Sequence, residues 1–89
     1  MDHDRPSFDA DTHVPLYEQV ADYIASLISD GRLRVGARLP AERELAEEYG
    51  VAYLTIRRAA QELRERGLIR TIHGKGTYVI SKPDGAPEE

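Results

Sequence analysis

This sequence predicts a mainly α-helical domain with one small β-hairpin, a winged helix-turn-helix made of three helices plus a wing. Three observations predict it. Apolar residues recur at helical spacing over residues 16–29. Two further helical segments follow and meet at Gly50. Two short β-rich runs then enclose a glycine-containing loop at residues 73–76. This order of elements is typical of proteins that place one helix in the major groove of DNA.

The first helix is predicted over residues 16–29. Its apolar stripe consists of Leu16, Tyr17, Val20, Ile24, Leu27 and Ile28, with Ala21 beside them. Pro15 suits the first turn, where its missing N–H leaves no helical hydrogen bond unmade. Gly31 is available for a left-handed cap at the other end. After a connecting turn, Arg38-Leu39 is expected to form a very short strand.

The next two helices are predicted over residues 42–49 and 53–66, closed by Gly50 and Gly67. Their inward positions are Leu45 and Ala46 in the first and Ile56, Ala59, Ala60 and Leu63 in the second. The outward face of the second carries Tyr53, Leu54, Arg57, Arg58 and Gln61. Residues near the N-terminus of such a helix reach base edges, so residues 53–66 form the candidate recognition helix.

Residues 68–72 and 77–80 are predicted to be short strands, because they are rich in Ile, Val, Thr and Tyr. The loop between them is His73-Gly74-Lys75-Gly76, whose two glycines suit positive φ angles. Its bare backbone can approach a sugar-phosphate chain or enter the minor groove, and Lys75 can add a phosphate contact. The loop is therefore the predicted wing.

Charge is distributed as a DNA-facing surface requires, although the net charge is −4. Residues 1–13 carry four aspartates against one arginine, and residues 81–89 carry three acidic residues against one lysine. Residues 53–75 carry six Lys or Arg against two Glu, a balance of +4. The positive charge therefore lies on the recognition helix and the hairpin. The alternative is that these arginines form only a solvated helix face.

Arg57 is the leading candidate for reading a base, because arginine can bind guanine O6 and N7 together. Positions 53 and 61 are Tyr and Gln, so no ion pair at i,i+4 spacing engages Arg57 on its own helix. Thr55 is short enough to hold a phosphate or touch a thymine methyl group. Tyr53 and Arg58 are further candidate DNA contacts on the outward face.

We expect one domain over residues 14–80, with a disordered acidic tail at residues 1–13 and a disordered tail at residues 81–89. The absence of Cys excludes disulfides and thiolate metal sites, and is compatible with a cytoplasmic location. No apolar run approaches the ~18 residues of a membrane span, and no signal peptide is expected. We also expect no cofactor and no metal site, because His73 has no ligand cluster nearby and Asp2-His3-Asp4 belongs to an acidic tail.

Residues 15–80 resemble the DNA-binding domain of GntR-type bacterial transcription regulators. The matching words are PLYEQVADYI, GARLPAERELAEEYGV, TIRRA, LRERGLI and HGKGTYV. The resemblance implies a transcription regulator, with repression expected, that binds a short palindromic operator in double-stranded DNA as a dimer. The DNA contacts that it implies are Arg43, Thr55, Arg57, His73 and Gly74.

This chain departs from the family pattern in three ways. The family usually has a polar pair such as Arg-Thr where this chain has Tyr53-Leu54. Serine often caps both motif helices, where Ala41 and Ala52 stand here. Such regulators also carry a C-terminal effector-binding and dimerising domain, and no effector domain is visible in this sequence. We therefore expect a monomer in free solution that pairs, if at all, on DNA.

Two other classes of function remain as alternatives. One is a winged-helix module that binds another protein, which would show little salt dependence or sequence preference toward DNA. The other is a domain fused to an enzyme, since some family members carry an aminotransferase-like domain. We do not expect an enzyme, because these residues offer neither a nucleophile–base pair nor the setting of a cofactor lysine.

Overall fold

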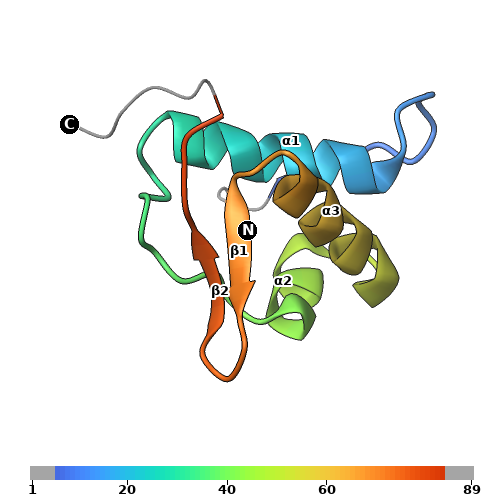
Figure 1. The fold of residues 1–89 in the computed structure, drawn as a ribbon. Coiled ribbons are helices and arrows are strands. Elements are labelled where there is room, and N and C mark those ends of the chain that lie inside the picture. The colour runs from blue at the N-terminus through green and yellow to red at the C-terminus, as the bar shows by residue number, and fades with distance from the viewer. Residues whose placement is uncertain (1–5, 84–89) are drawn as a thin grey trace.

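The computed structural model describes residues 6–83 (Figure 1). The helices are α1 (Leu16–Ser29), α2 (Glu42–Tyr49) and α3 (Tyr53–Glu65), and the strands are β1 (Ile69–Ile72) and β2 (Gly76–Val79). The predicted order of three helices and a hairpin is confirmed. The third helix ends one residue before its predicted end, because Arg66 serves as its C-cap.

Glycines end the second and third helices where the sequence predicted. Gly50 follows α2 with a φ of 70°, and Gly67 follows the cap of α3 with a φ of 79°. Glycine adopts this left-handed region without a steric penalty from Cβ. At the helix starts, Ala41 and Ala52 occupy the N-cap positions with extended backbone, and neither makes a side-chain cap. Glu44 accepts a hydrogen bond from the Ala41 N–H at 3.0 Å, so half of a capping box is present.

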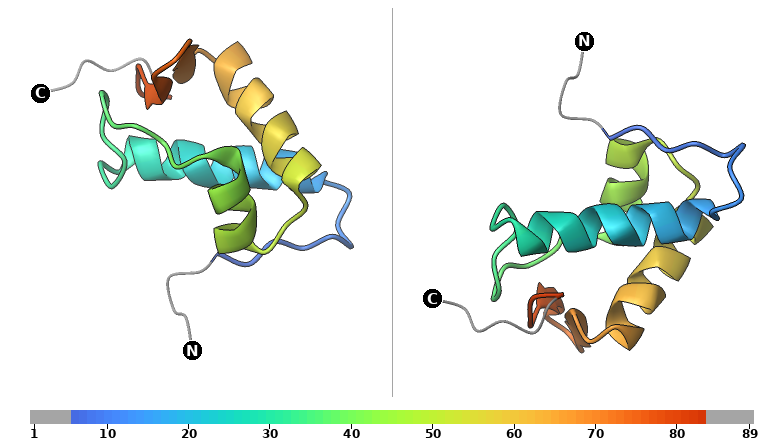
Figure 2. Two further views of the ribbon diagram at one scale, coloured as in Figure 1. Left: turned by 90° about the horizontal axis from the view of Figure 1, so that it is seen from below. Right: turned by 90° about the horizontal axis from the view of Figure 1, so that it is seen from above.

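The core lies where α1, α3 and the hairpin meet, with α3 crossing α1 (Figure 2). α1 buries Val20, Ala21, Ile24, Ala25 and Ile28. The other helices bury Leu45, Ala46, Tyr49, Ile56, Ala59 and Leu63, and Leu39, Leu68, Ile69 and Val79 complete the core. Ala60, predicted to be buried, is only partly so because it lines a groove beside the hairpin. This packing holds α3 with its first turn on the side away from α1.

The strands β1 and β2 pair antiparallel, and a third short segment joins the free edge of β2. There Arg38 pairs with Tyr78 in an isolated antiparallel bridge, and the Leu39 N–H donates to the Thr77 carbonyl at 2.8 Å. The very short strand expected at Arg38-Leu39 therefore exists as this bridge. It joins the segment that precedes α2 directly to the hairpin.

Residues 6–13, the described part of the expected acidic tail, contact α1 and α2. This segment has no helix or strand, but the Phe8 ring lies 6.0 Å from the Tyr23 ring and 5.9 Å from the Tyr49 ring, between centroids. The Gln19 side chain also holds both the N–H and the carbonyl of Asp9, at 2.9 and 2.8 Å. The partly buried Phe8 side chain therefore anchors the segment to the core. Residues 1–5 lie outside the described residues.

Most of the second expected tail also lies outside the described residues, which end at residue 83. Within the described part, the Ser81 hydroxyl donates to the Gly67 carbonyl at 2.8 Å. This hydrogen bond joins the chain just beyond the wing to the residue that follows the cap of α3.

Candidate nucleic-acid interface

The hairpin tip, α2 and the first turn of α3 all lie on the side of the molecule away from α1 (Figure 1). An open groove runs between them and is lined by residues from α2, α3, both strands and the segment before α2. Arg38, Arg43 and Arg64 contribute three guanidinium groups to its walls, against one carboxylate from Glu42. The groove is therefore predominantly positive, as a phosphate-binding surface requires.

Arg57 extends from the exposed face of α3, and its side chain is 60% exposed. Its own helix provides no ion-pair partner at i,i+4 spacing, as the sequence indicated, but its Nε lies 3.9 Å from Glu42 Oε1 on α2. Sequence reasoning missed this contact because the two residues belong to different helices. An exposed ion pair of this length is weak, so Arg57 can exchange Glu42 for a base edge or a phosphate.

Arg58 lies on the same exposed face but is directed toward α1. Its guanidinium carbon is 4.1 Å from the centroid of the Tyr17 ring, in a cation–π contact. Tyr17 thereby holds Arg58 on the flank of the recognition helix. From that flank a side chain is better placed for a phosphate than for a base edge.

Arg43 and Tyr53 are brought together from the two motif helices. The Arg43 guanidinium carbon is 4.5 Å from the centroid of the Tyr53 ring, while Arg43 remains exposed. Tyr53 is partly buried against the core rather than fully on the outward face. Thr55 is partly buried too, and its N–H donates to the Ala52 carbonyl at 3.0 Å at the helix start. The tyrosine therefore orients Arg43 at the N-terminal ends of α2 and α3.

The predicted wing residues His73, Gly74 and Lys75 are exposed at the hairpin tip. Gly74 has a φ of 78°, and the Lys75 N–H donates to the Ile72 carbonyl at 2.9 Å to close the turn. Gly76 has a φ of 129°, which favours glycine, and a Cβ there would also lie 2.6 Å from Nε of the Arg38 side chain. The Arg38 guanidinium thus lies directly over the hairpin backbone.

Sequence reasoning missed Arg64, which connects α3 to the wing. Arg64 Nη1 donates to Thr71 Oγ1 at 3.0 Å, and Thr71 Oγ1 lies 2.9 Å from Thr77 Oγ1 on the neighbouring strand. We call these three residues the α3–wing latch. No sequence signal identifies it, because its members lie on three separate elements. The latch links α3 to both strands of the hairpin.

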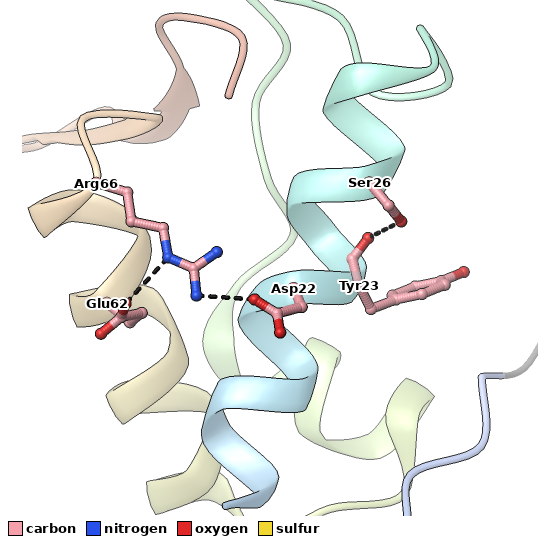
Figure 3. Close-up of polar contacts among 5 residues, drawn as sticks. All are labelled: Asp22, Tyr23, Ser26, Glu62 and Arg66. Atoms are coloured by element: carbon pink, nitrogen blue, oxygen red, sulfur yellow. Dashed lines mark hydrogen bonds and ion pairs between the residues drawn. The ribbon is translucent and has the colours of Figure 1, made fainter. Parts of the chain in front are cut away.

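A second cross-link holds α3 against α1 (Figure 3). Arg66 donates to Glu62 at 3.0 Å and to Asp22 of α1 at 2.8 Å, with 29% of its side chain exposed. Burial alone would lower the pKa of Arg66, but hydrogen bonds to Glu62 and Asp22 outweigh it and raise the pKa. The guanidinium thus stays charged and fixes the C-terminal end of α3.

Within residues 6–83, no group of three His, Asp or Glu side chains is placed to hold a metal ion. The motif Asp2-His3-Asp4 lies outside the described residues. In the same range, no helix has the length and apolar character needed to cross a bilayer.

Comparisons with known proteins agree on one family. The family model for bacterial regulatory proteins of the gntR family matches residues 16–79. The mannosyl-D-glycerate transport/metabolism system repressor MngR of Escherichia coli is 45% identical over 67 residues, which are 75% of this chain and 28% of MngR. The chain thus spans under a third of the length of that curated relative.

Solved structures give the same result. YtrA from Sulfolobus acidocaldarius, a GntR-family transcription factor, is 37% identical with a TM-score of 0.77, over 85% of this chain and 80% of YtrA. The AraR DNA-binding domain in complex with operator ORX1 is 33% identical with a TM-score of 0.76, over 88% of this chain and 99% of that domain. From the family match over most of its length and the likeness of its winged fold, this chain belongs to the GntR family of bacterial regulatory proteins.

Proposed function

We propose that this chain is the DNA-binding module of a transcription regulator that acts in the cytoplasm as a repressor. The observation that carries the proposal is the placement of cations. Figure 1 shows α2, the first turn of α3 and the hairpin tip on one side of the molecule, and the exposed Arg43, Arg57, Arg58 and Lys75 belong to α2, α3 and the hairpin loop. Repression is supported by the similarity to MngR, a repressor by name.

In the proposed complex, the N-terminal half of α3 enters the major groove. Arg57 exchanges Glu42 for a guanine, whose O6 and N7 accept both guanidinium donors. Arg43, held by Tyr53, and Arg58, held by Tyr17, bind phosphates on either side of the groove. Holding a cation before binding reduces the side-chain entropy that complex formation must remove.

The wing then follows the neighbouring sugar-phosphate chain. Gly74 lets the backbone come close, and His73 and Lys75 supply donors to phosphates or to the minor groove. One such module buries little surface, so we propose that two copies occupy a palindromic operator. The AraR DNA-binding domain, solved in complex with operator ORX1, has a similar fold, which supports DNA binding by this module.

Selection of bound duplexes from a random pool at defined salt tests the proposal. We expect an enriched inverted repeat, and an affinity that falls steeply as salt rises because counterions are released from the DNA. Recovery of unenriched sequences, with affinity nearly independent of salt, would favour the alternative of a module that binds another protein. The paired variant Arg43→Ala and Arg58→Ala serves as a control, because it should weaken binding and leave the enriched sequence unchanged.

A further inference from the structure

Leu54, in the first turn of α3, is the most exposed large apolar side chain in the part of the chain that the structure describes. It is 68% exposed, and the other large exposed hydrophobic in residues 6–83 is Ile80, at 46%. A single exposed leucine is ordinary on a protein surface. What distinguishes Leu54 is its position at the N-terminal tip of the proposed recognition helix.

The side chains around Leu54 are each held by a neighbour. A helix turns by about 100° per residue, so Leu54 lies about 60° from Arg57 and about 40° from Arg58, between the two and one turn ahead. Arg57 is drawn toward Glu42 of α2, and Arg58 is drawn toward Tyr17 of α1. Tyr53, the residue before it, packs beneath Arg43. Leu54 is therefore the side chain that projects from the helix tip between two cations.

An apolar side chain in this place has one matching group on the edges of the base pairs. In the major groove every base presents hydrogen-bond donors or acceptors, but only thymine also presents a methyl group. We propose that Leu54 selects thymine at one position of each half-site by packing against its C5-methyl group. The inference rests on the proposed function, because it needs α3 in the major groove.

The same geometry argues against an apolar protein partner for Leu54. The exposed cations on either side, Arg57 and Arg58, suit a polyanion and would be desolvated in a protein interface. The nearby part of α3 contributes no second exposed large hydrophobic with which to build a patch. A specific contact with one methyl group needs no patch.

The test removes the methyl group and nothing else. Each thymine of the selected operator is replaced in turn by deoxyuridine, and affinity is measured for the intact chain and for Leu54→Ala. At one thymine per half-site we expect deoxyuridine to weaken binding of the parent about fourfold, the effect of one buried methyl-sized group. At that same position Leu54→Ala should show no loss on replacement. Because Leu54 is exposed and alanine favours helix, the variant should fold like the parent.

The matched control is Ile80→Ala, which removes the other exposed large hydrophobic side chain. This variant should still lose about fourfold in affinity when that thymine is replaced by deoxyuridine. The inference is overturned if no thymine shows a methyl effect, or if Leu54→Ala keeps the whole effect. A change in self-association of Leu54→Ala without DNA, with methyl effects intact, would assign the side chain to a protein contact instead. Failure of the proposed function is a separate outcome, since no sequence would then be enriched and deoxyuridine would have no operator to probe.

Discussion

At the scale of single residues, Arg57 and Lys75 are both exposed cations, but they belong to different elements and should act differently on DNA. Arg57→Ala should lower affinity for the preferred operator by about 1–3 kcal/mol and relax selection at one base position. Lys75→Ala should weaken binding to all sequences alike and lower the salt slope by about one unit. Titrations at several salt concentrations, with preferred and scrambled duplexes, separate these effects. Unchanged affinity of Arg57→Ala for the preferred operator would remove Arg57 from the base-reading role.

The half-formed capping box at α2 leads to a second residue-scale prediction. Glu44 already accepts from the Ala41 N–H, but the alanine side chain has no oxygen to accept a hydrogen bond from the Glu44 N–H. Ala41→Ser should complete the box and raise the free energy of unfolding by about 0.5–2 kcal/mol. Urea denaturation measures it. Ala52→Ser at α3 is the comparison, where position 55 is Thr and only the serine half can form, so a smaller gain is expected.

At the scale of elements, the α3–wing latch should couple the wing to the recognition helix. Thr71→Val keeps the shape of the side chain but removes both hydrogen bonds, to Arg64 and to Thr77. These groups are exposed, so stability should change by less than about 1 kcal/mol. DNA affinity should fall. The loss of affinity caused by Lys75→Ala should also be smaller in the Thr71→Val background, because without the latch Lys75 is held less firmly near a phosphate and contributes less to binding.

Thr71→Ser, which keeps the hydroxyl, is the control for the latch and should bind like the parent. Additive effects of Thr71→Val and Lys75→Ala in the double-mutant cycle would show that the latch does not position the wing.

The aromatic contact between the N-terminal segment, α1 and α2 leads to a prediction about pH. Tyr49 is 7% exposed, and burial, with smaller contributions from the charge of Glu48 and from Tyr23, raises its pKa to about 12. Between about pH 10 and 12 the folded state keeps this proton while the unfolded state has lost it. The unfolded state then binds fewer protons, so stability should fall as pH rises through this window.

Tyr49→Phe should remove this part of the loss of stability at alkaline pH, because phenylalanine has no ionisable hydroxyl group. Urea denaturation of both proteins from pH 8 to pH 11 measures the difference between their free energies of unfolding. Parallel curves for the two proteins would show that Tyr49 ionises equally in both states.

At the scale of the whole molecule, few apolar side chains are left for self-association. In residues 6–83 the exposed large hydrophobics are Leu54 and Ile80. A stable dimer needs a larger apolar patch than these two provide. We therefore expect the 89-residue chain to sediment as a monomer at micromolar concentration and to pair on a palindromic duplex, where two half-sites raise effective concentration. A stable dimer in the absence of DNA would contradict this.

The helices, their ends and the hairpin were determined by the sequence itself, because their signals lie within single segments. The apolar spacing of residues 16–29 and the glycines at positions 50 and 67 specify a buried face and a stop wherever the rest of the chain lies. Glycines around Lys75 likewise specify a tight hairpin. The outward face of α3 follows from the same periodicity, which is why the sequence placed Arg57 and Arg58 correctly on the exposed face.

Contacts between elements were decided only by the tertiary structure. Arg57 with Glu42, Arg43 with Tyr53, and Phe8 with Tyr49 each join residues whose separation along the chain follows no helical or strand period. Such pairs depend on the angles at which helices cross, which the packing of side chains from several elements sets together. Periodicity therefore indicates which residues of α3 are exposed, whereas only the packed molecule shows that neighbours hold its two arginines and leave Leu54 projecting between them.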